Sequence, residues 1–195
     1  MISAIILAAG ESRRMGEQNK LLLSFSGQVL IHKIVETVCN SVVDDVLVVL
    51  GYEAENIKAV LENLPVRFLE NKGYEEGMTS SIQTGVRATA EVSQGLLICL
   101  ADMPFVDKAD LNRLVQAFTD LSKTESSLII VPVFQGKRGN PVLFSSKFRD
   151  EILLHDGEGC RGILRKHQQS IREIEMDSEH VLLDVDTPED YLLHS

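Results

Sequence analysis

Short apolar segments alternate with amphipathic segments along most of this sequence. The apolar segments are rich in Val, Ile and Leu, and they comprise residues 2–7, 45–50, 66–69, 95–100 and 127–132. Apolarity without strict alternation is typical of strands that are covered on both faces. The segments between them space their apolar residues as helices do, and they comprise residues 30–39, 53–63, 80–90 and 108–121. A polar turn at 135–139 and a further short strand at 141–144 follow. This order predicts one α/β domain with three α/β/α layers and a mostly parallel central sheet.

The composition is that of a soluble globular protein, and the net charge argues against one class of partner. Of the 195 residues, 44% are hydrophobic and 25% are charged, which suits a single continuous core. A net charge of −10 argues against nucleic acid, because binding to a phosphate backbone depends on clustered Lys and Arg. No apolar run approaches the roughly 18 residues that span a membrane, and no basic segment precedes the first strand, so we expect a cytoplasmic protein.

The three cysteines give no sign of a zinc site. Cys39, Cys99 and Cys160 lie far apart in the sequence and form no CxxC pair. Cys99 is flanked by Leu and Ile, where a cysteine is usually a small buried hydrophobic residue. We therefore look for functional residues elsewhere. In parallel α/β sheets, ligands bind outside the carboxyl ends of the strands, which draws attention to the loops after Leu7 and Leu100 and to the segment after Leu183.

The loop after the first strand combines small residues with basic ones. Ala8, Ala9 and Gly10 allow a ligand to approach the backbone, whose N–H groups can then point at phosphate oxygens. Arg14 and Lys20 supply positive charge close behind them. The loop differs from a P-loop, because five residues separate its two glycines, and the dinucleotide fingerprint GxGxxG is absent. A phosphate-binding loop and a solvated basic turn therefore both stay open.

Carboxylates follow the central apolar segment 95–100 and return near the C-terminus. Asp102 comes directly after that segment, with Pro104 behind it, where its side chain would face the expected ligand crevice. Mg²⁺ prefers one or two carboxylates together with substrate phosphates, so Asp102 is a candidate magnesium ligand. Asp184 and Asp186 are two residues apart and would share one face of an extended segment. A turn or N-cap role for Asp102, and a cap of the last helix for Asp186, stay open as well.

Five segments, taken together, resemble the molybdenum-cofactor nucleotidyltransferases, which transfer CMP or GMP to molybdopterin, and their wider relatives that act on sugar phosphates. The segments are residues 7–16 with Lys20, 76–82 with Asn71 before it, 101–104, 139–142 and 184–190. Each motif is weak alone, but their order matches and they span nearly the whole chain. The resemblance implies a Rossmann-like nucleotidyltransferase fold. It also implies that residues 1–104 mainly bind the nucleotide and that residues 105–195 form the acceptor side and supply a metal-binding Asp.

The resemblance assigns expected roles to individual residues. The nucleotide-binding residues that it implies are Leu7, Ala8, Ala9, Gly10, Arg14, Lys20, Asn71 and Ser81. The catalytic residues are Arg14, Lys20 and Asp102, the ligands of the Mg²⁺ cofactor are Asp102 and Asp186, and the acceptor side includes Asn140 and Arg161. An acceptor oxygen would attack the α-phosphorus in line and pyrophosphate would leave. This chemistry depends on positioning and charge neutralisation more than on a protein nucleophile.

Two details bear on the substrates. Ala9 resembles the cytidylyl group, because guanylyl relatives usually have Gly there, and its methyl group would crowd a purine. CTP is therefore expected over GTP, by about 1–3 kcal/mol. Residues 155–161 depart from the family's Gly-Asp-x-Gly-Ala-Arg segment, with Cys160 in place of Ala, and Asn140 stands where several relatives have His. The resemblance therefore leaves three alternatives open. The chain is an enzyme that acts on molybdopterin, or an enzyme that acts on another small phosphorylated molecule, such as a sugar phosphate. Alternatively, it is a non-catalytic nucleotide-binding chaperone, with a molybdenum enzyme as its partner.

Overall fold

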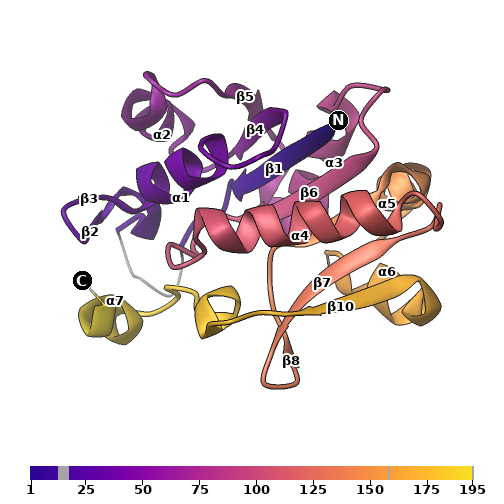
Figure 1. Cartoon of the computed structure of the whole chain (residues 1–195). Helices are drawn as coiled ribbons and strands as arrows, with labels where there is room; N and C mark the ends of the chain where they lie inside the picture. The colour runs from indigo at the N-terminus through magenta and orange to yellow at the C-terminus, as the bar shows by residue number, and fades with distance from the viewer. Residues whose placement is uncertain (13–17, 158, 195) are drawn as a thin grey trace.

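The chain folds into a sheet that lies between two layers of helices (Figure 1). The computed structural model describes residues 1–12, 18–157 and 159–194. Within these residues the main sheet has eight strands in the order β10-β7-β9-β6-β1-β4-β5, and β8 pairs with β7 outside this row. The strands are β1 Ile2–Ala8, β4 Asp45–Leu50, β5 Arg67–Glu70, β6 Gly95–Leu100, β7 Ile129–Phe134, β8 Lys137–Arg138, β9 Val142–Ser145 and β10 Ile171–Glu175.

Most neighbouring strands run parallel. β1 pairs in parallel with β4 and with β6, β4 pairs in parallel with β5, and β7 pairs in parallel with β10. β9 runs antiparallel to both of its neighbours, β6 and β7. In the register of the central strands, Leu7 lies beside Val49 on one side and Leu100 on the other. The carboxyl ends of β1, β4 and β6 therefore meet at the same edge of the sheet.

The helices follow the strands in the order that a doubly covered sheet requires. The α-helices are α1 Leu30–Cys39, α2 Ala54–Leu61, α3 Met78–Ala88, α4 Lys108–Leu121, α5 Arg149–Leu154, α6 Arg161–Lys166 and α7 Pro188–His194. The 3₁₀ helices are η2 Lys20–Leu22, η3 Tyr74–Glu76, η4 Ser146–Phe148, η5 Gln168–Ser170 and η6 Glu179–Leu182. A small hairpin of β2 Ser24–Phe25 and β3 Gln28–Val29 precedes α1. Among the described helices, none has the length and apolarity to cross a membrane.

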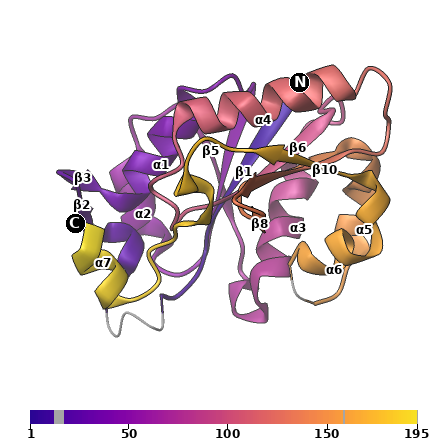
Figure 2. The same cartoon turned by 60° about the horizontal axis from the view of Figure 1, so that its bottom comes forward.

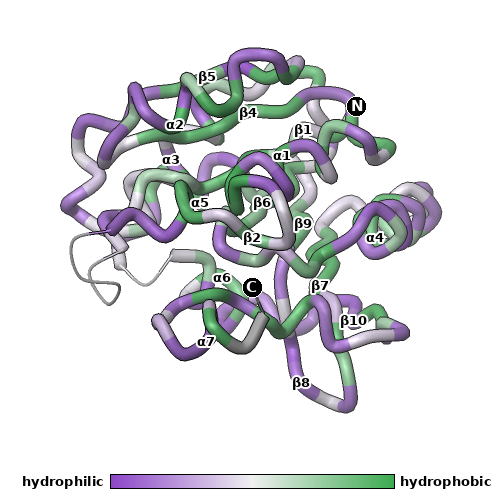
Figure 3. Tube along the Cα trace, turned by 90° about the vertical axis from the view of Figure 1, so that its left-hand side faces the viewer, coloured by the Kyte–Doolittle hydropathy of each residue, from purple (hydrophilic) through white to green (hydrophobic). Residues whose placement is uncertain are grey.

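Side chains of the sheet alternate between two cores, one on each face. On β1, Ala4 and Ile6 belong to one core and Ile5 to the other. The first core is covered by α1, α2 and α4, and the second by α3, α5 and α6 (Figure 2). In Figure 3, β4 is hydrophobic along most of its length. Burial on both faces explains why the central strands are continuously apolar in the sequence.

The predicted fold class is confirmed. The segments predicted at 45–50, 95–100, 30–39 and 108–121 have the same bounds as β4, β6, α1 and α4, and the other predicted elements lie within two residues of the observed ones. The polar turn predicted at 135–139 contains β8. The prediction missed β10, α5 and α6, because a short edge strand with charged residues and helices of six residues carry little periodic signal.

Candidate active site

The loops after β1 and β6 and the segment before α7 converge on one cleft. Its volume is about 430 Å³. Its lining combines these segments with the region from η3 to the start of α3, and consists of Leu7, Ala9, Gly10, Glu11, Ser12, Lys20, Leu21, Tyr74, Glu75, Gly77, Met78, Ser81, Leu100, Ala101, Asp102 and Asp186. Each of the three places that the sequence indicated therefore contributes to the same cleft.

A lysine in the cleft lies between two aspartates. Nζ of Lys20 donates a hydrogen bond of 2.7 Å to Oδ2 of Asp102 and one of 2.6 Å to Oδ1 of Asp186. The Lys20 side chain is only 11% exposed, and those of Asp102 and Asp186 are 23% and 22% exposed. Both ion pairs are thus partly removed from water, where charges interact more strongly than at an open surface.

Burial and neighbouring charges together shift the pKa values of Lys20 and Asp184. Burial on its own would lower the pKa of Lys20, but the charges and hydrogen bonds of Asp102 and Asp186 outweigh it, so the pKa is raised. The pKa of Asp184 is raised as well, first by burial and then by the negative charges of Asp186 and Asp102. The three aspartates therefore repel one another, and the Lys20 ammonium offsets part of that repulsion.

Local hydrogen bonds fix the backbone that carries Lys20. Asn19 caps η2, because its Oδ1 accepts a hydrogen bond of 3.1 Å from the backbone N–H of Leu21. The backbone N–H of Lys20 donates to Oγ of Ser12 at 3.3 Å. Ser12 lies in the loop directly after β1, so the start of η2 is tied to the small-residue loop. Lys20 consequently leaves a fixed backbone position and reaches the aspartates with its flexible stem.

The two aspartates are held together through the backbone. The N–H of Val185 donates to the carbonyl oxygen of Asp102 at 2.8 Å, which joins the segment before α7 to the loop after β6. Asp190 in α7 accepts hydrogen bonds from the backbone N–H and the hydroxyl of Thr187, each at 2.8 Å, and so caps this helix. The cap that the sequence left open is thus formed mainly by Thr187 and Asp190, and the carboxylate of Asp186 faces the cleft.

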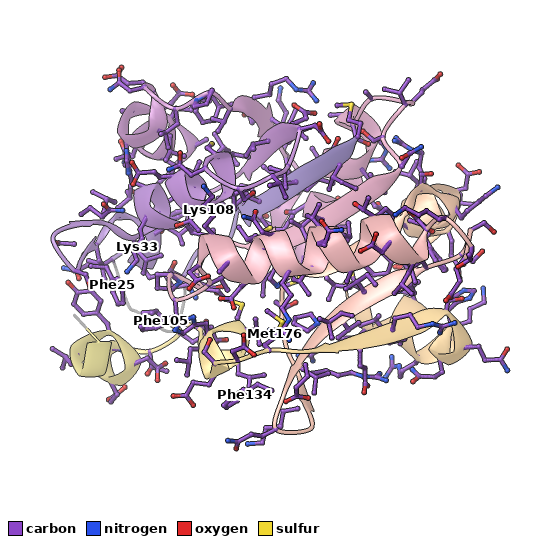
Figure 4. The ribbon with its side chains drawn as sticks, in the orientation of Figure 1. Phe25, Lys33, Phe105, Lys108, Phe134 and Met176 are labelled. Atoms are coloured by element: carbon purple, nitrogen blue, oxygen red, sulfur yellow. The ribbon has the colours of Figure 1, made fainter. Side chains whose placement is uncertain are left out.

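Aromatic packing connects the segment after η2 to the loop after β6. Phe25 is fully buried in β2, and its ring meets that of Phe105 edge to face at a centroid distance of 5.4 Å. The ammonium of Lys33 lies 5.1 Å from the centre of the Phe25 ring. These three side chains lie near one another in Figure 4. The ring contact between Phe25 and Phe105 stabilises the relative positions of the segment that carries Lys20 and the loop that carries Asp102.

Asp102 and Asp186 fit a divalent cation by the chemistry of their donors. Mg²⁺ typically takes one or two carboxylates from a protein and completes its shell with phosphate oxygens and water. Oδ1 of Asp102 is buried and accepts no hydrogen bond from any group in the described part of the chain. A buried acceptor without a partner costs about 1–3 kcal/mol. A cation bound at this oxygen would remove that cost, so the residues present suit a metal.

A second group of potential ligands has a different explanation. Asp107, Asp110 and His180 bring three donor atoms within 4.8 Å of one another. However, Asp107 and Asp110 form the capping box at the start of α4, with reciprocal hydrogen bonds of 2.9 and 3.0 Å. Nδ1 of His180 lies 3.2 Å from Oδ2 of Asp110. The carboxylates of this group thus stabilise a helix end, by about 1 kcal/mol.

The loop after β1 leaves room for a ligand. Among the described residues, and apart from its two chain neighbours, a Cβ atom placed on Gly10 would meet no atom within 4 Å, and Gly10 lines the cleft. Ala9 also lines the cleft, and its carbonyl oxygen accepts a hydrogen bond of 3.2 Å from the N–H of Tyr52. Leu7 lines the cleft as well, whereas Ala8 is buried and its side chain belongs to the core on the other face. Of the residues from Leu7 to Gly10, three therefore line the cleft, and Ala8 packs into the core.

Asn71 and Ser81 lie next to each other but are placed differently. Ser81 lines the cleft, whereas Asn71 is buried behind it. Nδ2 of Asn71 donates to the hydroxyl oxygens of Ser80 and Ser81 at 2.9 and 3.0 Å, and its Oδ1 accepts from the N–H of Gly73 at 3.0 Å. The amide of Asn71 is thus used to hold the turn before α3. The hydroxyl oxygen of Ser81 accepts this hydrogen bond from Asn71, and a serine hydroxyl can in addition donate one.

Asn140 and Arg161, the expected acceptor-side residues, are absent from the described lining of the cleft. Asn140 precedes β9, and its backbone N–H donates to the carbonyl oxygen of Val181 at 2.9 Å. Arg161 is exposed at the first position of α6. The segment before Arg161 approaches the start of α3, because the hydroxyl of Thr79 donates to the carbonyl oxygen of Gly157 at 2.6 Å. Arg14 falls among residues 13–17, outside the described residues.

Three residues of the described cleft lining escaped the sequence reasoning. They are Leu21 in η2 and Tyr74 and Glu75 in η3. Short 3₁₀ helices carry little periodic signal in a sequence. A Cβ on Gly51 would come within 2.7 Å of the Tyr74 side chain. Gly51 and Tyr74 approach each other only in the folded chain, so the local sequence around either residue does not predict the contact.

The geometry agrees with a comparison to known protein families. The family model of the MobA-like NTP transferase domain matches residues 4–171, which include the loop after β1, the turn before α3 and Asp102. The chain belongs to this family. The match confirms the resemblance seen in the sequence and makes this a transferase domain of the nucleotidyltransferase type.

Relatives of this NTP transferase domain carry several names. The purine catabolism protein PucB of Bacillus subtilis is 32% identical, over 96% of this chain and 92% of its own length. The nicotine blue oxidoreductase of Paenarthrobacter nicotinovorans is 28% identical, over 96% of this chain and 93% of its own length. A probable molybdenum cofactor guanylyltransferase of Methanosarcina acetivorans is 34% identical over 54% of this chain and 48% of its own length. These names differ, so relatedness alone does not select a substrate.

A solved structure shares the fold over nearly the entire domain. The nucleotidyl transferase Mth528 of Methanothermobacter superposes with a TM-score of 0.84 at 24% identity, covering 99% of this chain and 95% of its own. This likeness supports the Rossmann-like nucleotidyltransferase fold that the sequence predicted.

Proposed function

We propose that this NTP transferase domain transfers CMP from CTP to molybdopterin or a closely similar phosphorylated acceptor, with release of pyrophosphate. The observation that carries the proposal is the placement of Lys20 between Asp102 and Asp186, beside the small-residue loop after β1. A nucleotidyl transfer needs a cradle for a triphosphate, positive charge and metal-binding carboxylates in one cleft. The cleft brings all three together, from segments that are far apart in the sequence.

The protein residues would act mainly by positioning and by charge. The N–H groups between Ala9 and Ser12 can face the phosphates, because Gly10 adds no side chain to the cleft. Lys20, and Arg14 by resemblance, would neutralise charge on the triphosphate. The acceptor oxygen attacks the α-phosphorus, the bond from that phosphorus to the bridging oxygen breaks, and pyrophosphate leaves. Alignment of the two reacting oxygens and neutralisation of the phosphate charge together accelerate such a reaction.

Mg²⁺ is the proposed cofactor, held by Asp102 and Asp186. When bound, a divalent cation neutralises phosphate charge and orients the triphosphate and the acceptor. The unpartnered Oδ1 of Asp102 supports this assignment. The protein contributes the fixed distance between the two carboxylates, which the hydrogen bond from Val185 to Asp102 maintains.

The choice of CTP over GTP rests on Ala9. Ala9 lines the cleft, and by the resemblance the cytidylyl and guanylyl groups of the family differ at this position. Ser81 supplies a hydroxyl nearby for the base or the ribose, and Asn71 orients that hydroxyl from behind. The relative from Methanosarcina acetivorans is named for transfer of a guanylyl group, so the nucleotide must be measured directly.

The two halves of the chain have different proposed tasks. All but one of the residues in the described cleft lining lie between Leu7 and Asp102, which supports residues 1–104 as the nucleotide-binding half. Asp186 comes from the second half, where Asn140 and Arg161 are the proposed acceptor-side residues. We propose a cytoplasmic enzyme that acts on small molecules, with a molybdenum enzyme as the recipient of its product.

Transfer of label from CTP tests the proposal. The chain is incubated with α-³²P-labelled CTP, Mg²⁺ and either molybdopterin or a set of sugar phosphates, and labelled products and pyrophosphate are measured. We expect labelled product with molybdopterin. Labelled product with a sugar phosphate alone would select the alternative acceptor class. Tight CTP binding without transfer to any acceptor would favour the chaperone, although a binding module has no need of two metal carboxylates.

A further inference from the structure

The cation between the two cleft carboxylates is a side chain of the protein itself. Nζ of Lys20 lies 2.6 Å from Asp186 and 2.7 Å from Asp102, and so bridges the residues proposed to hold Mg²⁺. Among the described lining residues Lys20 is the only basic one, whereas four are acidic: Glu11, Glu75, Asp102 and Asp186. Without a cation between them, the two aspartates would repel each other in a partly buried place. The ammonium therefore stabilises the pair of carboxylates.

A lysine is suited to hold such a position temporarily. Its ammonium is a compact point charge on a flexible stem of four carbons, unlike the rigid fork of arginine. The Lys20 backbone is fixed, because its N–H donates to Ser12 and Asn19 caps the 3₁₀ helix that it begins. Ser12 and Gly10 line the same cleft, so a rotation of the stem would bring the ammonium toward anything bound there.

We propose that Lys20 is a stand-in cation, which occupies the position between Asp102 and Asp186 until a nucleoside triphosphate draws it away. This inference rests on the proposed metal site. A divalent cation that arrives alone must displace the ammonium and leave it without a partner. When the triphosphate arrives with the metal, its phosphates become the new partner of Lys20, and the two carboxylates are released to the metal. Metal and triphosphate therefore bind together, each raising the affinity of the other by the same factor.

Mn²⁺ binding to the full chain tests the stand-in role without measuring turnover. Free Mn²⁺ is followed by electron paramagnetic resonance in the wild type and in Lys20→Met, which keeps the stem and removes the charge. Lys108→Met is the matched control, because Lys108 is exposed at the start of α4 and absent from the cleft lining (Figure 4). We expect Lys20→Met to bind Mn²⁺ alone about 10- to 100-fold more tightly than the wild type, a coupling of ordinary size. Lys108→Met should match the wild type.

The nucleotide provides the second arm of the experiment. In the wild type, CTP should tighten Mn²⁺ binding by about 10- to 100-fold, and in Lys20→Met it should do so much less. If Lys20→Met fails to fold without metal, Lys20→Gln replaces it, since its neutral side chain, one bond shorter than that of Lys, keeps two N–H donors. Mn²⁺ binding to Lys20→Met that is no tighter than to the wild type would overturn the stand-in role, provided that both bind Mn²⁺ with CTP. Absence of Mn²⁺ binding in every variant, with and without CTP, would overturn the metal site as well.

Discussion

The backbone N–H of Val185 donates a hydrogen bond of 2.8 Å to the carbonyl oxygen of Asp102. This bond joins the end of β6 to a segment near the C-terminus and places Asp186 opposite Asp102, with Lys20 between them. The cleft is therefore complete only when both ends of the chain have folded against the central strands. A nucleotidyltransferase needs the charged groups of Lys20, Asp102 and Asp186 in fixed positions. The hydrogen bond from Val185 to Asp102 holds the two aspartate segments together.

Replacement of Asp102 by Asn should abolish most of the activity and leave the fold intact. The amide keeps the size of the side chain but loses the charge that holds a divalent cation. We expect kcat/KM to fall by about 100-fold or more, which corresponds to about 2.7 kcal/mol of transition-state stabilisation. The rate of pyrophosphate release measures it. Asp177→Asn is the control, because Asp177 is 90% exposed and pairs only at the surface with Arg113. A fully active Asp102→Asn enzyme would refute the metal assignment.

Replacement of Gly10 by Ala should separate ligand binding from folding. The added methyl group meets no atom of the other described residues within 4 Å, apart from the chain neighbours of Gly10, and it would enter the cleft that Gly10 lines. We expect the free energy of unfolding to change by less than about 1 kcal/mol, and the Kd for CTP to rise about tenfold.

Gly51→Ala provides the contrast. Its Cβ would lie 2.7 Å from Ala9 and Tyr74, so the substitution should lower the free energy of unfolding by about 1–3 kcal/mol. Chemical denaturation and calorimetric titration measure the two effects. Unchanged CTP affinity in Gly10→Ala would place the triphosphate elsewhere.

Replacement of Ala9 by Gly should relax the choice of nucleotide. Removal of the methyl group opens space for a purine at the loop after β1. We expect the ratio of kcat/KM for CTP to that for GTP to fall about 10- to 200-fold, the range for a difference of one methyl-sized group. The ratio is obtained from parallel assays with both nucleotides. If the ratio stays the same while activity is retained, another residue of the cleft selects the base.

The cysteines should be chemically inert in the folded chain. Burial raises the pKa of Cys99 and of Cys160 to about 12 in each case. At pH 8 their thiolates are therefore about 1000-fold rarer than in the unfolded chain, where the pKa is about 8.5. We expect iodoacetamide to label Cys160 far more slowly before than after denaturation, as measured by mass spectrometry of its peptide. Rapid labelling of Cys160 in the native chain would indicate a reactive thiol next to the acceptor side.

The fold was largely accessible from the sequence, because both faces of the central strands are covered. Continuous apolar segments and amphipathic segments of ten or more residues, such as α1 and α4, gave the layers and the strand–helix order. Antiparallel β9 and edge strand β10 required pairing across the sheet, and their local patterns do not specify a partner. Short helices such as α5 depend on packing against the second core more than on their own periodicity.

Only part of the candidate site could be predicted from the sequence. The rule that ligands bind at the carboxyl ends of parallel strands directed attention to Asp102, Asp186 and the loop after Leu7, all of which meet in the cleft. The bridge from Lys20 joins residues 82 and 166 positions away, so no local pattern predicts it. The hydrogen bonds of Asn71 to the turn before α3 also depend on the folded chain, and its expected place near the nucleotide stays a prediction.

Thermal unfolding in the presence of nucleotides tests the central claim most directly. The wild type is unfolded with CTP, GTP, ATP or UTP, each with and without Mg²⁺. A ligand at 100 times its Kd adds about 2.7 kcal/mol, which raises Tm by roughly 5–10 °C for a chain of this size. The account predicts the largest shift for CTP with Mg²⁺, and loss of the Mg²⁺ dependence in Asp102→Asn. The absence of a shift with every triphosphate would contradict a nucleotide site in the cleft.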